Sequence, residues 1–415
     1  MIARTSTYYI PFFDNSQALF EKYFPKGVVI LKTIGIICEY NPFHLGHKKQ
    51  IDLIRSKFGF DAAVVCLMSG NFVQRGAPAI FDKAVRAKAA LLAGADLVLE
   101  LPVTYALSSA EGFARGGVEI LGRFCDYLCF GCETGDTQSL MATAKALLSE
   151  EFKPLLRAEL DKGLSFPAAR AAALDALGMD AQILRRPNDI LAVEYCKAII
   201  STGTAMKPFP ILREGSYHAE VPDAENPSAT SLRRLIPEST DWQQYIPENC
   251  RNILENAPVH TLEAAERAVL MKLRTMTDEE FEALPYGSEG LWRKFMHASR
   301  KESSIAAITA ATKSKRYTAT RIHRLLLCAF LGISADCLAS PAPYVRALAF
   351  NDTGRAVLKQ ARDHLQIINA GESADHPYYQ MECRCADLYA LTRADGIDPP
   401  GQEEKQRIYY HKEIP

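Results

Sequence analysis

The sequence lacks three features that would each place the protein in a special class. No apolar run in its 415 residues approaches the length that a membrane-spanning helix needs. The formal net charge is only −1, which excludes a basic coat over the whole surface but leaves room for a local basic patch. The eleven cysteines are scattered and follow no secretory signal, so we expect reduced thiols and a cytoplasmic protein.

The strongest pattern that is present is a strand, a tight turn and a helix start within residues 33–51. Ile34–Cys38 is a short, β-branched apolar run, which is typical of a buried parallel strand. A polar turn follows, and His44, Gly46 and His47 then begin an amphipathic helix. A helix N-terminus attracts anions, glycine lets backbone approach a ligand, and imidazoles donate hydrogen bonds to phosphate oxygens. This stretch predicts a nucleotide triphosphate site.

Four more segments are predicted as strands, namely residues 61–68, 95–102, 126–133 and 206–212. The first runs into a Gly-rich polar loop with Arg75, which either lines the ligand crevice or is a solvated turn residue. Gly131 lies at the end of the third, where adenine or ribose can rest against backbone. The fourth contains two prolines, which predicts an edge strand, and it delivers Arg213, whose guanidinium suits phosphate or a purine.

Two predicted helix starts offer further polar groups. Asn188 has the donor and acceptor that adenine or ribose recognition requires, but it is equally suited to cap the helix. The segment 228–234 (SATSLRR) places hydroxyls and arginines where they could hold the β- and γ-phosphates of ATP, and capping by a serine or threonine explains the same letters. His218 is interpreted as a loop histidine rather than a base.

Beyond about residue 237 the pattern changes to helices, predicted over residues 261–276, 278–284, 291–299, 303–312 and 320–331. Residues 313–324 form the densest basic cluster in the chain and contain one aromatic residue, Tyr317. Arg321 and Arg324 are three residues apart on a helix, so they share a face. Basic side chains with an interleaved aromatic suit contacts with RNA, although a solvated helix start has the same composition.

Several strings resemble blocks of a known family. His44-x-Gly46-His47 after a strand resembles the HxGH element of the nucleotidylyltransferase superfamily. The longer strings EYNPFHLGH, SGNFVQRGAPA, PNDILAVEY and KRYTATRIHR resemble the bacterial tRNA(Met) cytidine acetate ligase family, from about residue 33 to the C-terminal region. The resemblance implies an enzyme that activates acetate with ATP as acetyl-adenylate and then acetylates the wobble cytidine of elongator tRNA(Met).

The resemblance also implies the architecture. We expect an α/β fold, with a parallel-sheet nucleotidyltransferase-like domain that binds ATP over residues 33–225 and a mainly α-helical, tRNA-binding domain over residues 226–415. The aromatic-rich residues 1–32 form an N-terminal extension for which we expect no catalytic role. The implied partners are acetate and elongator tRNA(Met), with no membrane and no obligate protein partner.

The site residues follow from the same resemblance. We expect catalysis from His44, His47 and Lys48, which would stabilise charge on the α-phosphate. The expected ATP contacts are Ile37, Cys38, Glu39, Tyr40, Asn41, Pro42, Phe43, His44, Leu45, Gly46, His47, Lys48, Lys49, Gln50, Gly131, Asn188 and Arg213. The expected tRNA contacts are Lys83, on the polar side of a helix predicted over residues 81–93, and Lys315, Arg316, Arg321 and Arg324. Mg²⁺ is expected to bridge the phosphates, although the sequence shows no carboxylate cluster dedicated to it and does not identify its ligands.

The residues by themselves predict ATP-dependent nucleotidyl transfer. Acetate and tRNA(Met) are predicted as substrates only from the resemblance. One alternative is a small-molecule adenylyltransferase or carboxylate–amine ligase with the same turn, which would not need the basic helical region. Another is a non-catalytic nucleotide-binding or tRNA-binding protein on this scaffold. Pyrophosphate release separates the second alternative from an enzyme, and dependence on RNA separates the first.

Overall fold

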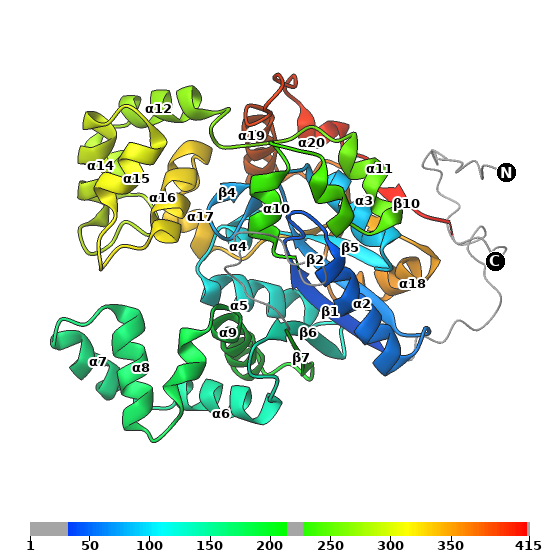
Figure 1. Cartoon of the computed structure of the whole chain (residues 1–415), viewed down its shortest axis with the longest axis horizontal. Coiled ribbons are helices and arrows are strands. Elements are labelled where there is room, and N and C mark those ends of the chain that lie inside the picture. Colours follow the sequence, from blue (N-terminus) through cyan, green and yellow to red (C-terminus); the bar gives the residue numbers. More distant parts are fainter. Residues whose placement is uncertain (1–31, 214–226, 413–415) are drawn as a thin grey trace.

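A computed structural model describes residues 32–213 and 227–412 of the chain. At its centre lies one eight-stranded sheet with the order β10-β8-β5-β2-β1-β6-β7, and β9 pairs with β8 (Figure 1). The strands are β1 (Thr33–Cys38), β2 (Ala63–Ser69), β5 (Leu97–Leu101), β6 (Tyr127–Cys132), β7 (Lys207–Leu212), β8 (Val345–Phe350), β9 (Ile367–Asn369) and β10 (Tyr409–Tyr410). A short hairpin, β3 (Phe72–Val73) with β4 (Ala77–Pro78), stands apart from this sheet.

The parallel half of the sheet agrees with the prediction. β2 pairs with β1 and β5, and β6 pairs with β1 and β7, all in parallel. Every residue of β1 and β2 is buried, as expected for apolar runs that are covered on both faces. β7, with Pro208 and Pro210, lies at the edge of the sheet, which confirms the expected edge strand.

The other half of the sheet was not predicted. β8 pairs antiparallel with β5, and β9 and β10 pair with β8. These strands come from the region expected to be mainly helical, so the boundary predicted between residues 225 and 226 does not divide sheet from helices. β7 is also not the last strand. The sequence pattern for these three strands is weak, because β9 and β10 span only three and two residues and β8 contains a buried arginine, Arg346.

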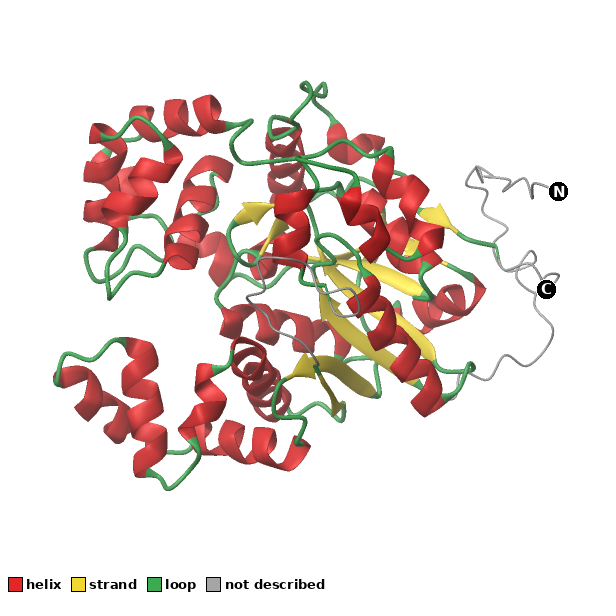
Figure 2. Cartoon of the chain, viewed as in Figure 1, coloured by secondary structure: helices red, strands yellow, loops and turns green. Residues whose placement is uncertain are grey.

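Helices cover both faces of the sheet (Figure 2). Alternate residues of β1 point to opposite faces: Ile37 belongs to one core cluster, and Ile34 and Ile36 belong to another. The first cluster includes residues of α5 (Ala110–Leu121), α9 (Pro187–Thr202) and α18 (Asp352–Ala361). The second includes residues of α2 (Leu45–Phe58), α3 (Lys83–Leu92) and α11 (Glu248–Glu255).

A third core cluster holds a separate helical layer to one side of the sheet (Figure 1). Its helices are α12 (Glu266–Thr275), α13 (Asp278–Glu282), α14 (Leu291–Lys301), α15 (Ile305–Thr312), α16 (Ala319–Leu331) and α19 (Pro377–Ala390). The five helices predicted between residues 261 and 331 therefore exist, with ends shifted by a few residues. We call α12–α16 the outer helical layer.

The remaining elements connect these parts. They are α4 (Val103–Ala106), α6 (Thr137–Leu148), α7 (Phe152–Asp161), α8 (Phe166–Ala176), α10 (Ala229–Leu235), α17 (Ala335–Ala339), α20 (Gln402–Lys405) and two 3-10 helices, Ala181–Arg185 and Asp241–Tyr245. Of the helices in the described ranges, none is both long and apolar enough to cross a membrane. The predicted N-terminal extension lies outside the described residues except for Lys32, and His218 lies outside them as well.

Candidate active site

The predicted strand, turn and helix are present. β1 ends at Cys38, and His44 is the N-cap residue of α2. The Nδ1 atom of His44 accepts a hydrogen bond from the backbone N–H of Gly46 at 3.1 Å, and Nδ1 of His47 accepts one from the backbone N–H of His44 at 3.3 Å. The two imidazoles stack with their ring centroids 3.8 Å apart. The pair therefore satisfies the free amides at the helix start that a serine or aspartate would otherwise cap.

These contacts define the protonation of the two rings. Burial lowers the pKa of His44 to about 3, and the guanidinium groups of Arg213 and Arg233 contribute to the shift. Burial, followed by His44 and Arg213, also holds the pKa of His47 well below its ordinary value. Both rings are therefore neutral near pH 7. Because each Nδ1 accepts a backbone N–H, each proton is assigned to Nε2, which leaves two Nε2–H donors for a ligand.

The side chains of the turn have mostly structural contacts. Tyr40 and Phe43 are buried, and their rings lie 4.8 and 5.5 Å from the ring of His47. Asn41 Oδ1 accepts the N–H of Ile80 at 2.8 Å, whereas its buried Nδ2 has no partner. The peptide bond between Asn41 and Pro42 is cis. Tyr40, Phe43 and Asn41 thus fix the path of the turn and the position of His47.

The remaining predicted ATP contacts near α2 differ in exposure. The side chains of Ile37 and Cys38 are buried in the sheet core, so a nucleotide can meet them only through backbone. Gln50 Nε2 donates to Cys129 Sγ at 3.4 Å. Leu45 and Lys48 are partly exposed and Lys49 is exposed, and Lys48 forms an ion pair with Asp52 one turn further along α2.

Gly131 and Arg213 meet at the ends of β6 and β7. A Cβ atom on residue 131 would lie 2.8 Å from Cδ of Arg213, so only glycine leaves room for the arginine to lie across this strand. Arg213 is exposed, and its Nη1 donates to Asn188 Oδ1 at 3.4 Å. The structure therefore brings together Gly131, Asn188 and Arg213, with the arginine side chain resting against the glycine. Their contact with ATP stays a prediction.

Asn188 is not the N-cap residue of α9, which corrects one of its two predicted interpretations. The N-cap position belongs to Arg186, whose side chain makes no capping hydrogen bond. Glu133 caps the helix instead: its carboxylate accepts from Asn188 Nδ2 at 2.7 Å and from the N–H of Asp189 at 2.8 Å. Asp189 Oδ1 in turn accepts the N–H of Glu133 at 2.8 Å. Sequence reasoning missed Glu133, because it lies more than fifty residues before the helix that it caps.

The structure confirms the capping role of the SATSLRR segment, and its contact with the phosphates of ATP stays a prediction. Ser228 caps α10 by accepting the N–H of Ser231 at 3.1 Å. Arg233 donates through Nη1 to the carbonyl of Asn41 at 2.7 Å and through Nη2 to Thr230 Oγ1 at 3.1 Å. Burial lowers the pKa of Arg233, and the carboxylate of Glu39 opposes this shift. Arg233 thus lies beside the turn that precedes the histidine pair.

The loop after β2 is attached to the site through the end of β1. Gln74 N–H donates to Glu39 Oε1 at 2.9 Å. Arg86, a fully buried residue of α3, donates to the carbonyls of Glu39 at 2.6 Å and Ser69 at 3.0 Å. Arg86 therefore holds the ends of β1 and β2 together, and it does so with carbonyls rather than with a carboxylate.

Lys83 is corrected from a predicted RNA contact to a buried structural residue. Its side chain is 3% exposed, and its Nζ lies 2.8 Å from Glu100 Oε2 and 2.7 Å from Glu403 Oε2. Glu403 belongs to α20, more than three hundred residues away, so a distant segment supplies one of the two carboxylates that pair with Lys83. The ammonium is therefore not available to an RNA phosphate.

The two arginines predicted to contact RNA from α16 also turn inward. Arg321 is paired with Glu289 at 3.1 Å and donates to the carbonyl of Tyr286 at 3.0 Å. Arg324 is only 9% exposed, donates to the carbonyl of Gln74 at 3.3 Å and lies 5.3 Å above the ring of Tyr286. Burial excludes Arg324 from the predicted phosphate contact in this conformation.

Lys315 and Arg316, the other two predicted RNA contacts of this region, are exposed. The predicted basic cluster therefore divides into the inward Arg321 and Arg324 and the outward Lys315 and Arg316. Lys313, in the same cluster, is exposed as well, so three of its cationic groups are open to a polyanion.

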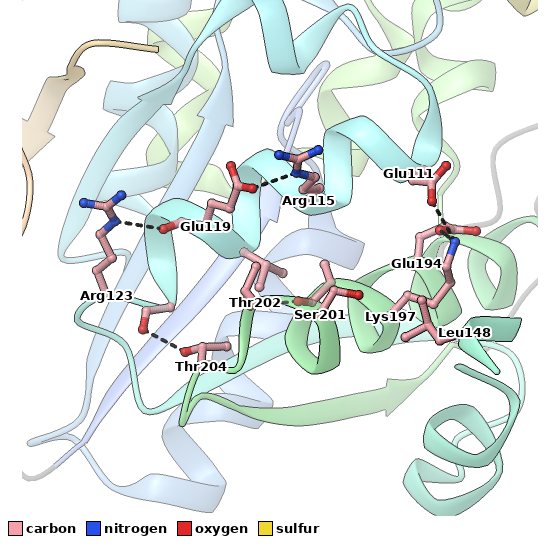
Figure 3. Close-up of a pocket in the computed structure, with 13 residues that line it drawn as sticks. Glu111, Arg115, Glu119, Arg123, Leu148, Glu194, Lys197, Ser201, Thr202 and Thr204 are labelled. Carbon is pink, nitrogen blue, oxygen red and sulfur yellow. Dashed lines mark hydrogen bonds and ion pairs between the residues drawn. The ribbon is translucent and has the colours of Figure 1, made fainter. Parts of the chain in front are cut away.

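A groove of about 740 Å³ lies between α5 and α9, and neither His44 nor His47 is among the residues that line it (Figure 3). None of the predicted site residues lines it. Its charged side chains pair with one another: Lys197 lies 2.9 Å from Glu111 and 2.8 Å from Glu194, and Arg115 lies 2.7 Å from Glu119. We assign no function to this groove.

Comparisons with known proteins agree with this geometry. The model of the HIGH nucleotidyl transferase family matches residues 31–404. The tRNA(Met) cytidine acetate ligase of Clostridium novyi is 38% identical over 356 residues, which cover 81% of this chain and 89% of that protein. The enzyme of the same name from Clostridium perfringens is 37% identical over 386 residues, which cover 87% of this chain and 95% of that protein.

Solved structures agree as well. Thermotoga maritima TmcAL in its apo form superposes with a TM-score of 0.84 at 29% identity, over 92% of this chain and 100% of that one. The same protein bound with alpha-thio ATP gives a TM-score of 0.82 at 28% identity, with the same coverage. The chain described here therefore belongs to the HIGH nucleotidyl transferases and, within them, to the tRNA(Met) cytidine acetate ligase family.

Proposed function

We propose that this protein is an ATP-dependent ligase that activates acetate as acetyl-adenylate and transfers the acetyl group to the wobble cytidine of elongator tRNA(Met), forming N(4)-acetylcytidine. The observation that carries the proposal is the neutral, stacked pair of His44 and His47 at the start of α2, with Arg213 and Arg233 near it. The names of the relatives and the alpha-thio ATP bound by the Thermotoga protein support it.

The triphosphate would lie over the start of α2. Neutral imidazoles are suited to this position because each keeps an Nε2–H donor without the cost of a buried positive charge. Arg213 and Arg233 supply the positive charge instead, from the end of β7 and from α10. An anion bound between these groups would offset the influence of the arginines and raise the pKa values of both histidines.

In the first step an acetate oxygen attacks the α-phosphorus of ATP. The new bond joins that oxygen to the α-phosphorus, and the bond from the α-phosphorus to the oxygen that bridges to the β-phosphorus breaks, so pyrophosphate leaves. His44 and His47 donate to the α-phosphate oxygens, where negative charge accumulates in the transition state. Lys48, one residue further along α2, is the third predicted catalytic group, and release from Asp52 would let its ammonium reach the phosphates.

In the second step the exocyclic amine of cytidine attacks the carbonyl carbon of acetyl-adenylate. A carbon–nitrogen bond forms, the anhydride carbon–oxygen bond breaks, AMP leaves with the electron pair, and the amine releases a proton. The mixed anhydride is already activated, so the main task of the protein is to orient the two reactants. The anticodon base must be turned out of its stack to reach the site.

Magnesium would accompany the nucleotide. Within residues 32–213 and 227–412 no group of three or more histidine, cysteine, aspartate or glutamate side chains is arranged to hold a metal ion. Mg²⁺ commonly keeps several waters and binds through substrate phosphates, which fits a site without a carboxylate cage. The roles given above to the histidines and arginines do not depend on it.

The test is to incubate the purified protein with ATP, Mg²⁺, labelled acetate and total bacterial tRNA, without acetyl-coenzyme A. We expect label in acetylcytidine after the RNA is digested. Acetyl-adenylate without labelled RNA would overturn the RNA step and favour a small-molecule ligase. Neither product, from folded protein that binds ATP, would overturn the enzymatic proposal and favour a nucleotide-sensing protein.

A further inference from the structure

The outer helical layer carries an imbalance of charge that the site does not use. Residues 290–318 contain seven lysines and arginines but one acidic residue, Glu302, whereas the whole chain has a net charge of −1. The basic residues are Arg293, Lys294, Arg300, Lys301, Lys313, Lys315 and Arg316. Such a local excess in a nearly neutral protein points to an anionic partner.

The basic residues gather on two adjacent segments. Arg293, His297 and Lys301 are spaced four residues apart on α14, so they lie on one face of the helix, and all three are exposed. Lys294 Nζ donates to the carbonyl of Lys313 at 3.2 Å, which places α14 beside the loop between α15 and α16. Figure 1 shows α14 at the far edge of the outer helical layer.

Most of these cations have no acidic partner among the residues that the structure describes. In the described part of the chain, only Arg300 among the seven forms an ion pair, with Asp278 at 2.5 Å. α7 offers a contrast, because its surface cations pair with acids three or four residues away: Lys153 with Glu150 at 2.7 Å and Arg157 with Asp161 at 3.1 Å. Uncompensated like charges on one helix repel one another, so a bound polyanion would relieve that repulsion.

An aromatic ring lies within the same surface. The guanidinium of Arg293 is 4.9 Å from the ring centroid of Trp292, which is only partly buried. Flat cationic and aromatic groups together are used to contact RNA backbones and unstacked bases. This combination favours RNA over an acidic protein segment as the partner.

We propose that the exposed face of α14, formed by Arg293, Lys294, His297 and Lys301, acts with Lys313, Lys315 and Arg316 to hold the phosphate backbone of the substrate RNA. Arg321 and Arg324 brace this layer from inside and do not touch the RNA. The inference rests on the proposed function, because RNA is the substrate there. It differs from the sequence prediction by adding α14 and by removing the two inward arginines.

The test compares two triple variants of the full-length protein. The first, R293Q with K301Q and K315Q, removes three of the proposed contacts. The control, K153Q with R157Q and K162Q, removes three cations that are already paired on α7. The Kd for bacterial tRNA is measured by fluorescence anisotropy at several salt concentrations, and acetate-dependent exchange of pyrophosphate into ATP is measured without RNA.

We expect the first variant to weaken tRNA binding by about tenfold or more and to reduce the salt dependence, as the slope of log K against log salt, by roughly 2 to 3. Its pyrophosphate exchange and the tRNA binding of the control should match the wild type. Unchanged binding and slope in the first variant would overturn the proposal, as would a larger loss in the control.

Failure of the proposed function has a different signature. If the wild-type protein lacks acetate-dependent exchange, the ligase proposal fails, whereas loss of tRNA binding only in the first variant would still support this surface. If the triple variant unfolds, R316E alone repeats the test, because Arg316 lies in an exposed loop outside the helix packing. Unchanged tRNA binding and salt slope in R316E would then count against the surface.

Discussion

The start of α2 and the outer helical layer use positive and hydrogen-bonding side chains in opposite ways. At the start of α2 the groups are held by protein partners: His44 and His47 by backbone amides, Arg86 and Arg233 by carbonyls. On α14 three of the four cations are exposed, Lys294 is partly buried, and most have no acidic partner in the described part of the chain. Partnered groups hold their geometry before a ligand arrives, which suits catalysis, whereas free surface cations suit the binding of a long polyanion.

The comparison predicts different consequences for the same kind of substitution in the two regions. A change at the start of α2 should have a large effect that is nearly independent of salt, because buried groups are poorly screened. A change on α14 should have a small effect that depends on salt. The predictions below run from the largest expected effect to the smallest.

The sharpest contrast is between two histidines. H47A removes a donor aimed at the α-phosphate, so we expect acetate-dependent pyrophosphate exchange to fall by about 10² to 10³-fold, the range for loss of one transition-state donor. H297A, on the exposed face of α14, should leave exchange unchanged. Both are measured without RNA at saturating ATP. Equal losses of pyrophosphate exchange in H47A and H297A would contradict the difference between the two regions.

Substitution of Arg86 tests whether the partnered groups near the start of α2 stabilise the fold. In R86M the carbonyls of Glu39 and Ser69 lose a charged donor in a fully buried place, so we expect a loss of about 3 kcal/mol or more in the free energy of unfolding. K88M is the matched control on α3, where the ammonium lies over the ring of Tyr409 at 4.9 Å, and it should lose less than about 1 kcal/mol. Urea unfolding gives both values, and a loss as small in R86M as in the control would contradict this role.

The histidine pair also predicts a dependence of stability on pH. The pKa of His44 is about 3 in the folded protein and lies near 6.5 in an unfolded chain. Between these values the unfolded state binds a proton that the folded state does not. His44 therefore lowers stability progressively as the pH falls from about 6.5 towards 3, and has no such effect above about 6.5.

In H44N the amide can still accept a hydrogen bond at the helix start, but it does not titrate. Below about pH 6 the stability of this variant should fall less steeply than that of the wild type, by up to about 1.4 kcal/mol per pH unit. Urea unfolding at several pH values between 4 and 8 measures the difference. Parallel curves for the two proteins would show that His44 is not held neutral.

The smallest effects are expected for substitutions of Arg324, which points inward, and Arg316, which is exposed. R324A removes a hydrogen bond to Gln74 and a contact with Tyr286, so we expect a loss of about 1 to 2 kcal/mol in stability and an unchanged salt slope for tRNA binding. R316A should leave stability unchanged and reduce that slope by about 1. A reduced salt slope in R324A together with reduced stability in R316A would contradict the distinction between the inward and the outward arginines.

Features encoded by neighbouring residues could be predicted from the sequence. The strand, turn and helix around His44 need only residues 33–51, and the parallel strands and the helices of the outer layer follow from their own apolar patterns. Features created by distant segments could not. α20 covers Lys83, and the segment at residues 286–289 binds Arg321.

The strands β8 to β10 also depend on distant segments. β8 pairs with β5, and β9 and β10 pair with β8, so these strands were not predicted from apolar patterns of their own. Glu133 was missed for a related reason. It caps a helix that begins more than fifty residues later, and no spacing rule links the two positions. The residue types therefore show which positions are charged and which are apolar. They do not show which of the charged side chains are buried in the folded protein.

The central claim is that the site at the start of α2 activates acetate by itself, and that RNA binds to a separate surface. Acetate-dependent exchange of labelled pyrophosphate into ATP, measured with and without tRNA, tests it most directly. The account predicts exchange by the wild type and by the R293Q, K301Q, K315Q variant without tRNA, and almost none by H47A. Exchange by folded wild-type protein only when tRNA is present, or its loss in the triple variant, would contradict the account.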